Sequence, residues 1–209
     1  MKGLFVLADD DPRWNLDPVE QARLACEGGA AVVQLRAKRA LDRQTLAWAE
    51  EIRAITRACG CLFFMNDRFD LALVADADGV HLGQDDVPPA GIPPAVRETL
   101  LVGRSTHTLA QARAAAAEPV DYVAFGPVFE TRSVDSPYEA RGLAMLADAV
   151  RIAAPRPLVA IGGIGLDNAS DIFASGAAGA AVISAVVAAE DPAIAAGLLA
   201  AALRGGPTP

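Results

Sequence analysis

The sequence predicts a single (β/α)8 TIM barrel, an α/β fold in which residues 1–209 form one domain. Strand-like and helix-like patterns alternate along the whole chain without a long linker, which favours one closed barrel. No GxGxxG follows the first predicted strand, so the usual reason to prefer an open, doubly wound sheet is missing. Late in the chain, two apolar strands end in glycine or serine, which is typical of the phosphate site of such a barrel.

The predicted strands are short apolar runs, each followed by polar or small residues. They cover residues 3–9, 31–35, 62–65, 79–82, 100–103, 122–125, 158–161 and 180–183. In a barrel all strands end on one face, so we expect the residues that follow them to converge there.

The predicted helices are longer, and some carry start and stop signals, such as Pro18 in a first turn and glycines 28 and 29 after a last turn. They cover residues 18–27, 42–59, 69–75, a short stretch after the prolines of 88–94, and then 109–117, 142–153, 167–174 and 191–203. The tail, residues 205–209, is expected to fray.

Composition excludes some classes of function. With 18 basic and 26 acidic residues the net charge is −8, which argues against a nucleic-acid partner. A polyanionic ligand must then be held by local basic groups, backbone N–H groups or a metal. The three cysteines, an odd number without metal-like spacing, indicate a reducing compartment, and no segment predicts a signal peptide or a membrane span. We therefore predict a cytoplasmic protein, with homo-oligomerisation left open.

Two basic residues follow the second strand. If the strand continued, Arg36 and Lys38 would point to the same side and could grip a di- or triphosphate-like anion together. The alternative is a solvated basic turn.

Two aspartates follow the neighbouring third and fourth strands. Asp67 and Asp86 suggest a Mg²⁺ site, because Mg²⁺ takes a few carboxylate oxygens together with water and substrate phosphate. A paired acid/base role, and a helix cap at Asp67, are the alternatives. Asp85 competes with Asp86 for the role.

Hydroxyl and imidazole groups follow the fifth strand. Ser105 and Thr106 can donate to an anion, and His107 is either an acid/base group or, as we prefer, a hydrogen-bonded structural histidine. His81 alternates with apolar neighbours inside the fourth strand, which predicts a buried ring with satisfied hydrogen bonds rather than a ligand.

The segment 129–141 is too long for a plain turn, so we expect a lid over the site, with Thr131 and Ser133 supplying hydroxyls. Glycines 162 and 163 and, after the last strand, Ser184 allow backbone N–H groups to approach an anion. Two ordinary turns of a parallel sheet are the alternative.

Seven motifs resemble the thiamine-phosphate synthase family, in order and over nearly the whole chain. They are QLRAK (34–38), MNDRFDLAL (65–73), DGVHLGQDD (78–86), GRSTHT (103–108), DYVAFGPVFET (121–131), IGGIGLDN (161–168) and AAVIS (180–184). The resemblance implies a transferase of thiamine biosynthesis. Hydroxymethylpyrimidine pyrophosphate loses pyrophosphate, and the nitrogen of a thiazole phosphate captures the resulting pyrimidine cation.

The resemblance also implies roles for residues. Mg²⁺ would be the cofactor, held by Asp67 and Asp86. The catalytic groups would be Arg36, Lys38 and Ser105, facing the pyrophosphate. The remaining substrate-binding residues would be Gln34 and Asn66 on the pyrimidine pyrophosphate side, Thr131 and Ser133 toward the thiazole, and Gly163, Ile183 and Ser184 around its phosphate.

Two departures from the family pattern keep alternatives open. A lysine is expected soon after Thr131, but Val134 stands there, with Arg132 or Arg141 as replacements. The FET and ARGL pieces also resemble a thiazole tautomerase of the same superfamily, although that branch has a histidine where this chain has Pro127. A tautomerase and a non-catalytic binder of thiazole or thiamine phosphate are therefore the alternative functions.

Overall fold

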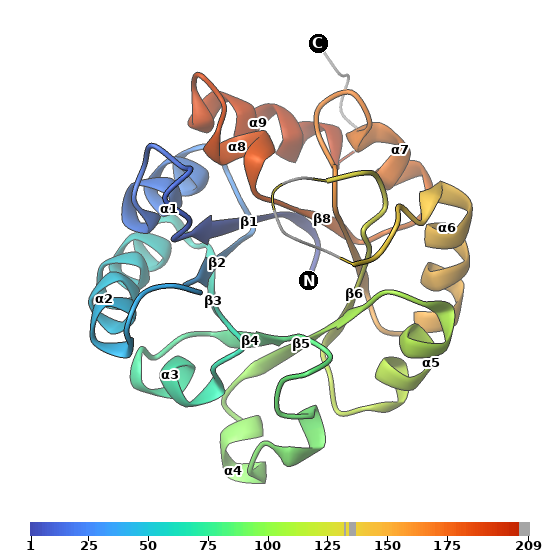
Figure 1. Cartoon of the computed structure of the whole chain (residues 1–209), viewed down its shortest axis with the longest axis horizontal. Coiled ribbons are helices and arrows are strands. Elements are labelled where there is room, and N and C mark those ends of the chain that lie inside the picture. The colour runs from blue at the N-terminus through green and yellow to red at the C-terminus, as the bar shows by residue number, and fades with distance from the viewer. Residues whose placement is uncertain (132, 134–136, 205–209) are drawn as a thin grey trace.

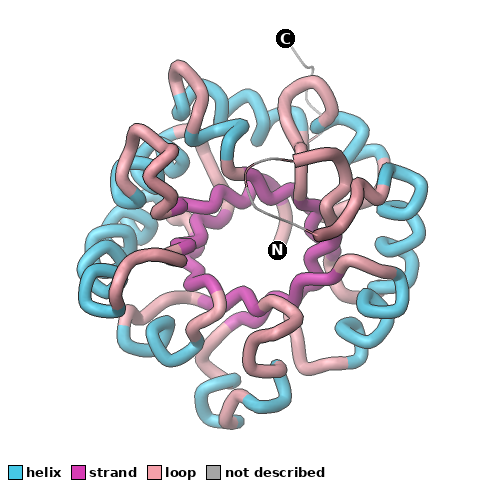
Figure 2. The backbone as a smooth tube through the Cα atoms, in the orientation of Figure 1, coloured by secondary structure: helices cyan, strands magenta, loops and turns pink. Residues whose placement is uncertain are grey.

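In the computed structural model, parallel strands close into a barrel in sequence order, β1 to β8, with β8 pairing back onto β1. The structure describes residues 1–131, 133 and 137–204. Figures 1 and 2 show the strands as an inner ring surrounded by helices. The predicted (β/α)8 barrel is confirmed. Its strands are β1 (Gly3–Asp9), β2 (Val32–Arg36), β3 (Leu62–Asn66), β4 (Gly79–Leu82), β5 (Leu101–Thr106), β6 (Tyr122–Phe125), β7 (Leu158–Ile161) and β8 (Gly179–Val182).

The helices follow the strands in alternation, as predicted, with one addition. A short helix, α8, directly follows β8 at the mouth of the barrel. It was not predicted, because four residues are too few for a periodic pattern. The helices are α1 (Pro18–Glu27), α2 (Asp42–Cys59), α3 (Phe69–Val74), α4 (Pro94–Arg97), α5 (Leu109–Ala117), α6 (Gly142–Ala153), α7 (Ala169–Ala174), α8 (Ser184–Val187) and α9 (Pro192–Ala202), with a 3-10 turn at Pro89–Gly91.

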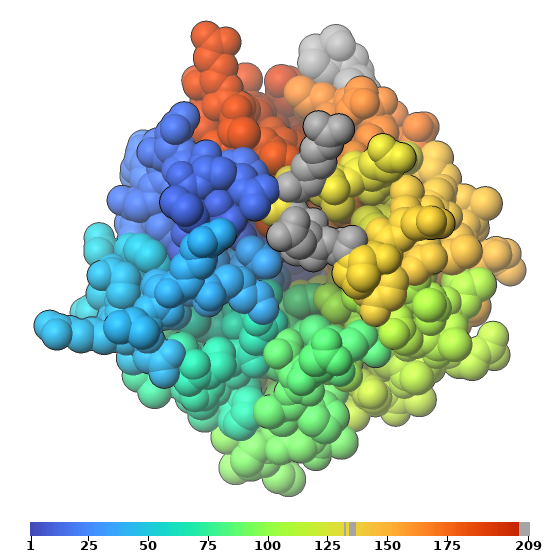
Figure 3. Space-filling view, viewed as in Figure 1, coloured from blue at the N-terminus to red at the C-terminus, as the bar shows by residue number. Residues whose placement is uncertain are grey.

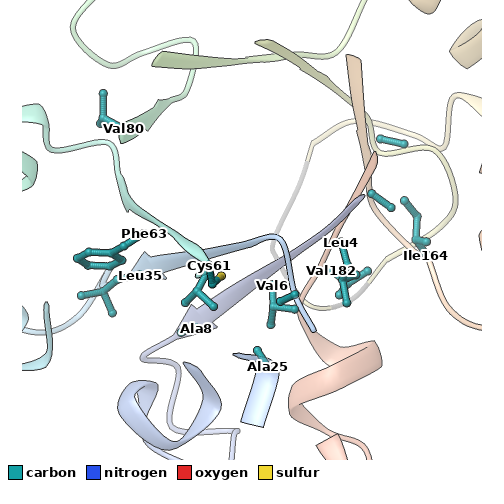
Figure 4. Close-up of a cluster of buried hydrophobic side chains, with 14 of the residues drawn as sticks. Leu4, Val6, Ala8, Ala25, Leu35, Cys61, Phe63, Val80, Ile164 and Val182 are labelled. Atoms are coloured by element: carbon teal, nitrogen blue, oxygen red, sulfur yellow. The ribbon is translucent and has the colours of Figure 1, made fainter. Parts of the chain in front are cut away.

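Strands such as β1 send alternate side chains to two separate cores, because successive residues of a strand point to opposite faces. On β1, Leu4, Val6 and Ala8 belong to the core between strands and helices. Figure 4 shows part of that layer, with Val6 directed toward Ala25 of α1. The intervening Phe5 and Leu7 point into the barrel, where an apolar cluster forms the floor below the mouth.

Two strand ends differ from the prediction. β5 continues to Thr106, so Ser105 and Thr106 are strand residues rather than loop residues. β2 ends at Arg36, so the extended geometry that would place Arg36 and Lys38 on one side stops between them. The predicted tail at 205–209 lies outside the described residues.

None of the helices in the described part of the chain combines the length and apolar character that a membrane crossing needs.

Candidate active site

A cavity of about 470 Å³ opens at the carboxyl ends of the strands. This size suits a small-molecule ligand. Figure 3 shows the face toward which these ends point, where segments from both halves of the chain surround the barrel axis. The inner apolar cluster, which includes Phe5, Leu7 and Val159, lines its base, and polar side chains lie above.

The cavity brings together most of the predicted site residues. Its lining includes Gln34, Arg36, Asn66, Ser105, Thr131, Ser133, Gly163, Ile183 and Ser184. The lining does not include Lys38, Asp67 or Asp86, which form a second, connected group beside it.

Arg36 is paired with a carboxylate that was not among the predicted site residues. Its guanidinium donates to Asp9, which is 1% exposed at the end of β1. The indole N–H of Trp14 also donates to Asp9, at 3.1 Å. Asp9 lies beside Arg36 in the β1–β2 register, so the pairing follows from the strand alignment. Arg36 thus faces the cavity with its charge already paired to Asp9.

Lys38 leaves the cavity side because an aspartate turns the chain after β2. Asp10 accepts backbone N–H bonds from Lys38, Arg39 and Ala40, at 2.7 to 2.9 Å. This wrapped turn directs the ammonium of Lys38 to the carboxylate of Asp67. The strand does not continue to Lys38, so the condition for placing Arg36 and Lys38 on one side is not met. Lys38 pairs with Asp67, and a joint grip of Arg36 and Lys38 on one anion stays a prediction.

Asp67 and Asp86 lie next to each other, as the barrel order of β3 and β4 predicts. Burial, and then the neighbouring Asp67 carboxylate, raise the pKa of Asp86. Asp86 also accepts the backbone N–H of Gly83 at 2.6 Å, whereas Asp85 is exposed. Asp67 adopts a left-handed φ of 63° while its own N–H donates to the carbonyl of His81, so the backbone fixes its place at the rim.

His81 is a buried ring with both nitrogens bonded, as predicted. Nδ1 lies 2.7 Å from the hydroxyl of Tyr122 and Nε2 lies 2.8 Å from Oγ of Ser105. Burial lowers the pKa of His81 to about 4, so the ring is neutral at pH 7. Tyr122 stacks on the imidazole and occupies the space above Gly103, where a Cβ would lie 2.2 Å from the tyrosine ring. The Tyr122 partner was not predicted, because nothing in the sequence marks it apart from an apolar strand residue.

Gln34 carries an unsatisfied acceptor into the cavity. The residue is 3% exposed, and its Oε1 has no hydrogen-bond partner among the described residues. A buried acceptor without a donor costs free energy, and a ligand N–H or O–H placed here would remove that cost.

On the opposite wall, glycines 162 and 163 have left-handed φ values of 99° and 64°. A Cβ on Gly162 would meet Pro127, and one on Gly163 would meet the carbonyl of Glu130 at 2.4 Å. The glycines are thus needed for packing against the segment after β6 as well as for any approach to a ligand. Across the cavity mouth, Oγ of Ser133 donates to Oγ of Ser184 at 2.8 Å, which joins the segment after β6 to the start of α8.

His107 also lines the cavity and matches the preferred structural interpretation. Its Nδ1 bonds the carbonyl of Gly126 at 2.7 Å, and its ring stacks on Tyr138 at 4.0 Å between centroids. The guanidinium of Arg141 lies over the Tyr138 ring, 5.5 Å from its centroid. Val134, which stands where the family lysine is expected, and Arg132, the other candidate replacement besides Arg141, lie outside the described residues.

The fold and this mouth define a (β/α)8-barrel protein whose candidate active site lies where charged and hydroxyl side chains gather over an apolar floor. Comparison with known families narrows this class. The family model described as thiamine monophosphate synthase matches residues 4–186, and the chain belongs to that family.

Curated relatives agree with the family. A thiamine-phosphate synthase of Anaeromyxobacter dehalogenans is 48% identical over 204 residues, which are 98% of this chain and 89% of the relative. One of Methanoculleus marisnigri is 47% identical over 184 residues, covering 88% and 87%.

A solved structure titled thiamine phosphate pyrophosphorylase, from Pyrococcus furiosus, has a TM-score of 0.87 and 37% identity, and covers 97% of this chain and 96% of its own. A 3-hexulose-6-phosphate synthase, with a TM-score of 0.68, 22% identity and coverage of 97% and 99%, shares the fold alone. The resemblance found from the motifs is confirmed.

Proposed function

We propose that this chain is a thiamine-phosphate synthase, a transferase that joins hydroxymethylpyrimidine pyrophosphate to thiazole phosphate and releases pyrophosphate. The observation that carries the proposal is a set of charged side chains at one cavity in a member of the thiamine monophosphate synthase family. Arg36 lines the cavity, and Lys38, Asp67 and Asp86 lie beside it. The names of the relatives favour this function over the tautomerase and the non-catalytic binder.

The pyrimidine half of the reaction fits the side of the cavity formed by β2 to β5. Gln34 Oε1, the unsatisfied acceptor, suits the amino group of an aminopyrimidine. Arg36 and Asn66 line the same side, and Ser105 presents a hydroxyl held by His81. As the pyrophosphate departs, negative charge grows on its oxygens, and Arg36, Lys38 and Ser105 are placed to stabilise it.

The thiazole half fits the opposite side. Thr131 and Ser133 line the cavity there, with Gly163, Ile183 and Ser184 around the space assigned to the thiazole phosphate. The thiazole nitrogen captures the pyrimidine cation that the departure of pyrophosphate leaves. The cation that forms in between must be kept from water, which gives the segment after β6 a role as cover.

Mg²⁺ fits the residues present. Asp67 and Asp86 are adjacent carboxylates, and the pKa of Asp86 is raised. A cation would reduce the repulsion between them, and the ammonium of Lys38 already approaches Asp67. Mg²⁺ needs few protein ligands, because it takes its other ligands from water and substrate phosphate. Asp67 and Asp86 would hold the ion, and its charge would help to neutralise the leaving pyrophosphate.

We also propose a cytoplasmic location, supported by the free thiols of Cys26, Cys59 and Cys61. Homo-oligomerisation stays a prediction.

The test is pyrophosphate release from the two substrates with and without Mg²⁺. We expect metal-dependent release of pyrophosphate and formation of thiamine phosphate in equal amounts. Aromatisation of a carboxythiazole phosphate without metal would support the tautomerase instead, and tight thiamine phosphate binding without turnover would support the binder.

Adjacent aspartates provide a matched control. Asp86→Asn should lower turnover by about 100-fold or more, a size typical for loss of a group that stabilises developing charge. Asp85→Asn, one residue away and exposed, should keep wild-type turnover. Equal losses in the two variants would contradict the assignment of Asp86.

A further inference from the structure

A buried arginine lies directly behind the loop that carries Asp86. Arg104 is 6% exposed and sits on β5 between Gly103 and Ser105. Ser105 lines the cavity, so Arg104 points the other way, out of the barrel and toward the loop after β4.

The guanidinium of Arg104 donates its hydrogen bonds to backbone carbonyls rather than to a carboxylate. Nη1 donates to the carbonyl of Gly83, and Nη2 lies 3.5 Å from the carbonyl of Gln84. The nearby acid is Glu118, whose Oε2 is 3.7 Å from Nε of Arg104 and has no hydrogen-bond partner among the described residues. Glu118 therefore offsets the buried charge, while the guanidinium N–H groups remain available for the loop.

Those two carbonyls belong to the turn that holds Asp86. The N–H of Gly83 donates to Oδ2 of Asp86 at 2.6 Å, which closes the turn on itself. The side chain of Gln84 donates back to the carbonyl of Ser105. Gly83 and Gln84 are thus both hydrogen-bonded to β5, and the Asp86 carboxylate is hydrogen-bonded to Gly83.

We propose that Arg104 is a positioning residue that holds the turn 83–86 so that the Asp86 carboxylate faces Asp67. The inference rests on the proposed metal role of Asp86 for its catalytic meaning, but the geometry concerns this chain's own residues. Arg104 touches no substrate and no reacting atom. It acts through the carbonyls of Gly83 and Gln84.

The experiment compares Arg104→Met and Arg104→Lys with the wild type, without substrate. Hydrogen exchange is followed in the peptide that covers residues 83–87, and Mg²⁺ binding is measured by calorimetry. Arg104→Met removes both donors at nearly constant side-chain length. We expect at least tenfold faster exchange in the peptide and about tenfold weaker Mg²⁺ binding. Arg104→Lys, which keeps the charge and one point of contact, should recover part of both effects.

Arg97 provides the matched control. It also donates to two backbone carbonyls, of Leu100 and Pro119, and pairs with Asp121, but it lies before β5 at the far end of the barrel. Arg97→Met should lower the unfolding temperature while leaving exchange at 83–87 and the Mg²⁺ dissociation constant unchanged. Where Arg104→Met does not fold, Arg104→Lys alone carries the comparison, with an expected threefold change in exchange.

Two outcomes would overturn the proposal. One is wild-type exchange at 83–87 in the folded Arg104 variants. The other is an equal change in exchange and Mg²⁺ binding in Arg97→Met, which would show a general loss of stability. A wild type that binds no Mg²⁺ would refute the metal site, whereas faster exchange in Arg104→Met would still support the positioning role.

Discussion

Replacing Gln34 by methionine should stabilise the free protein and weaken substrate binding at the same time. Gln34 is 3% exposed, and its Oε1 is unpaired among the described residues. A buried polar group without a partner costs about 1–3 kcal/mol, and methionine has a similar shape without the oxygen. We expect the free energy of unfolding to rise by about 1–2 kcal/mol, which for a chain of this size raises the melting temperature by about 2–8 °C.

The same change should raise the KM for the pyrimidine pyrophosphate by about tenfold or more, because the hydrogen bond that Gln34 is proposed to accept is worth about 1–3 kcal/mol. Thermal and urea unfolding without ligand measure the first effect, and steady-state kinetics measure the second. Higher stability with unchanged KM would refute the proposed substrate contact. Lower stability would refute the argument that Oε1 is unsatisfied.

Gln21 is the matched control for this experiment. It is 1% exposed, but its side chain is fully used: Oε1 accepts from the N–H of Asp9 at 2.8 Å, and Nε2 donates to the carbonyls of Asp9 and Leu16 at 2.9 and 2.7 Å. Gln21→Met leaves these groups unpaired, so it should destabilise the protein by about 2–3 kcal/mol. Opposite signs at Gln34 and Gln21 are the result that hydrogen-bond satisfaction predicts.

Three further predictions concern the histidine, a glycine and the lysine of the site. The pKa of His81 lies at about 4 when folded, below its ordinary 6.5, so the unfolded chain takes up the proton first. Stability should therefore fall by about 3 kcal/mol as the pH drops from 6.5 to 4, and urea unfolding across this range should show a flatter profile for His81→Gln. Gly103→Ala should cost about 3 kcal/mol, because the new Cβ would lie 2.2 Å from the ring of Tyr122; Tyr122→Leu should recover part of that loss in urea unfolding, and simple additivity would refute the clash. Lys38→Met should tighten Mg²⁺ binding about fivefold in calorimetry, since the ammonium competes for Asp67 in a partly exposed pair worth about 1 kcal/mol; an unchanged dissociation constant would argue against a shared site.

The barrel was predictable because its signals are local. β1 alternates between two cores, and the glycines after β7 mark a loop with no room for a side chain. The end of β5 was not predictable, because it depends on partners of Arg104 that lie far away in the sequence. The predicted strand stops at Gly103, one residue before the charged Arg104. Backbone carbonyls and Glu118 satisfy that charge, and the strand runs on to Thr106.

The positions of the site residues were predictable, but their partners were not. All strands of a parallel barrel end on one face, so the motif residues had to converge. Which side chain meets which depends on distances between elements, and no local pattern reports them. Asp9, Asp10 and Tyr122 were missed for this reason, since each acts through a neighbour on another strand or loop.

These partners change how the rim is understood. Separate positive and negative residues in the sequence suggested a basic grip for one ligand and an acidic site for another. In the folded chain the charges are already matched, Arg36 with Asp9 and Lys38 with Asp67. A rim of matched pairs holds its side chains in place before any ligand arrives, so little ordering remains to be done on binding. It also means that a pyrophosphate must compete with Asp67 for Lys38, unless a cation takes over that carboxylate when the anion enters. Metal and pyrophosphate should therefore bind with positive coupling, each making the exchange of partners less costly for the other.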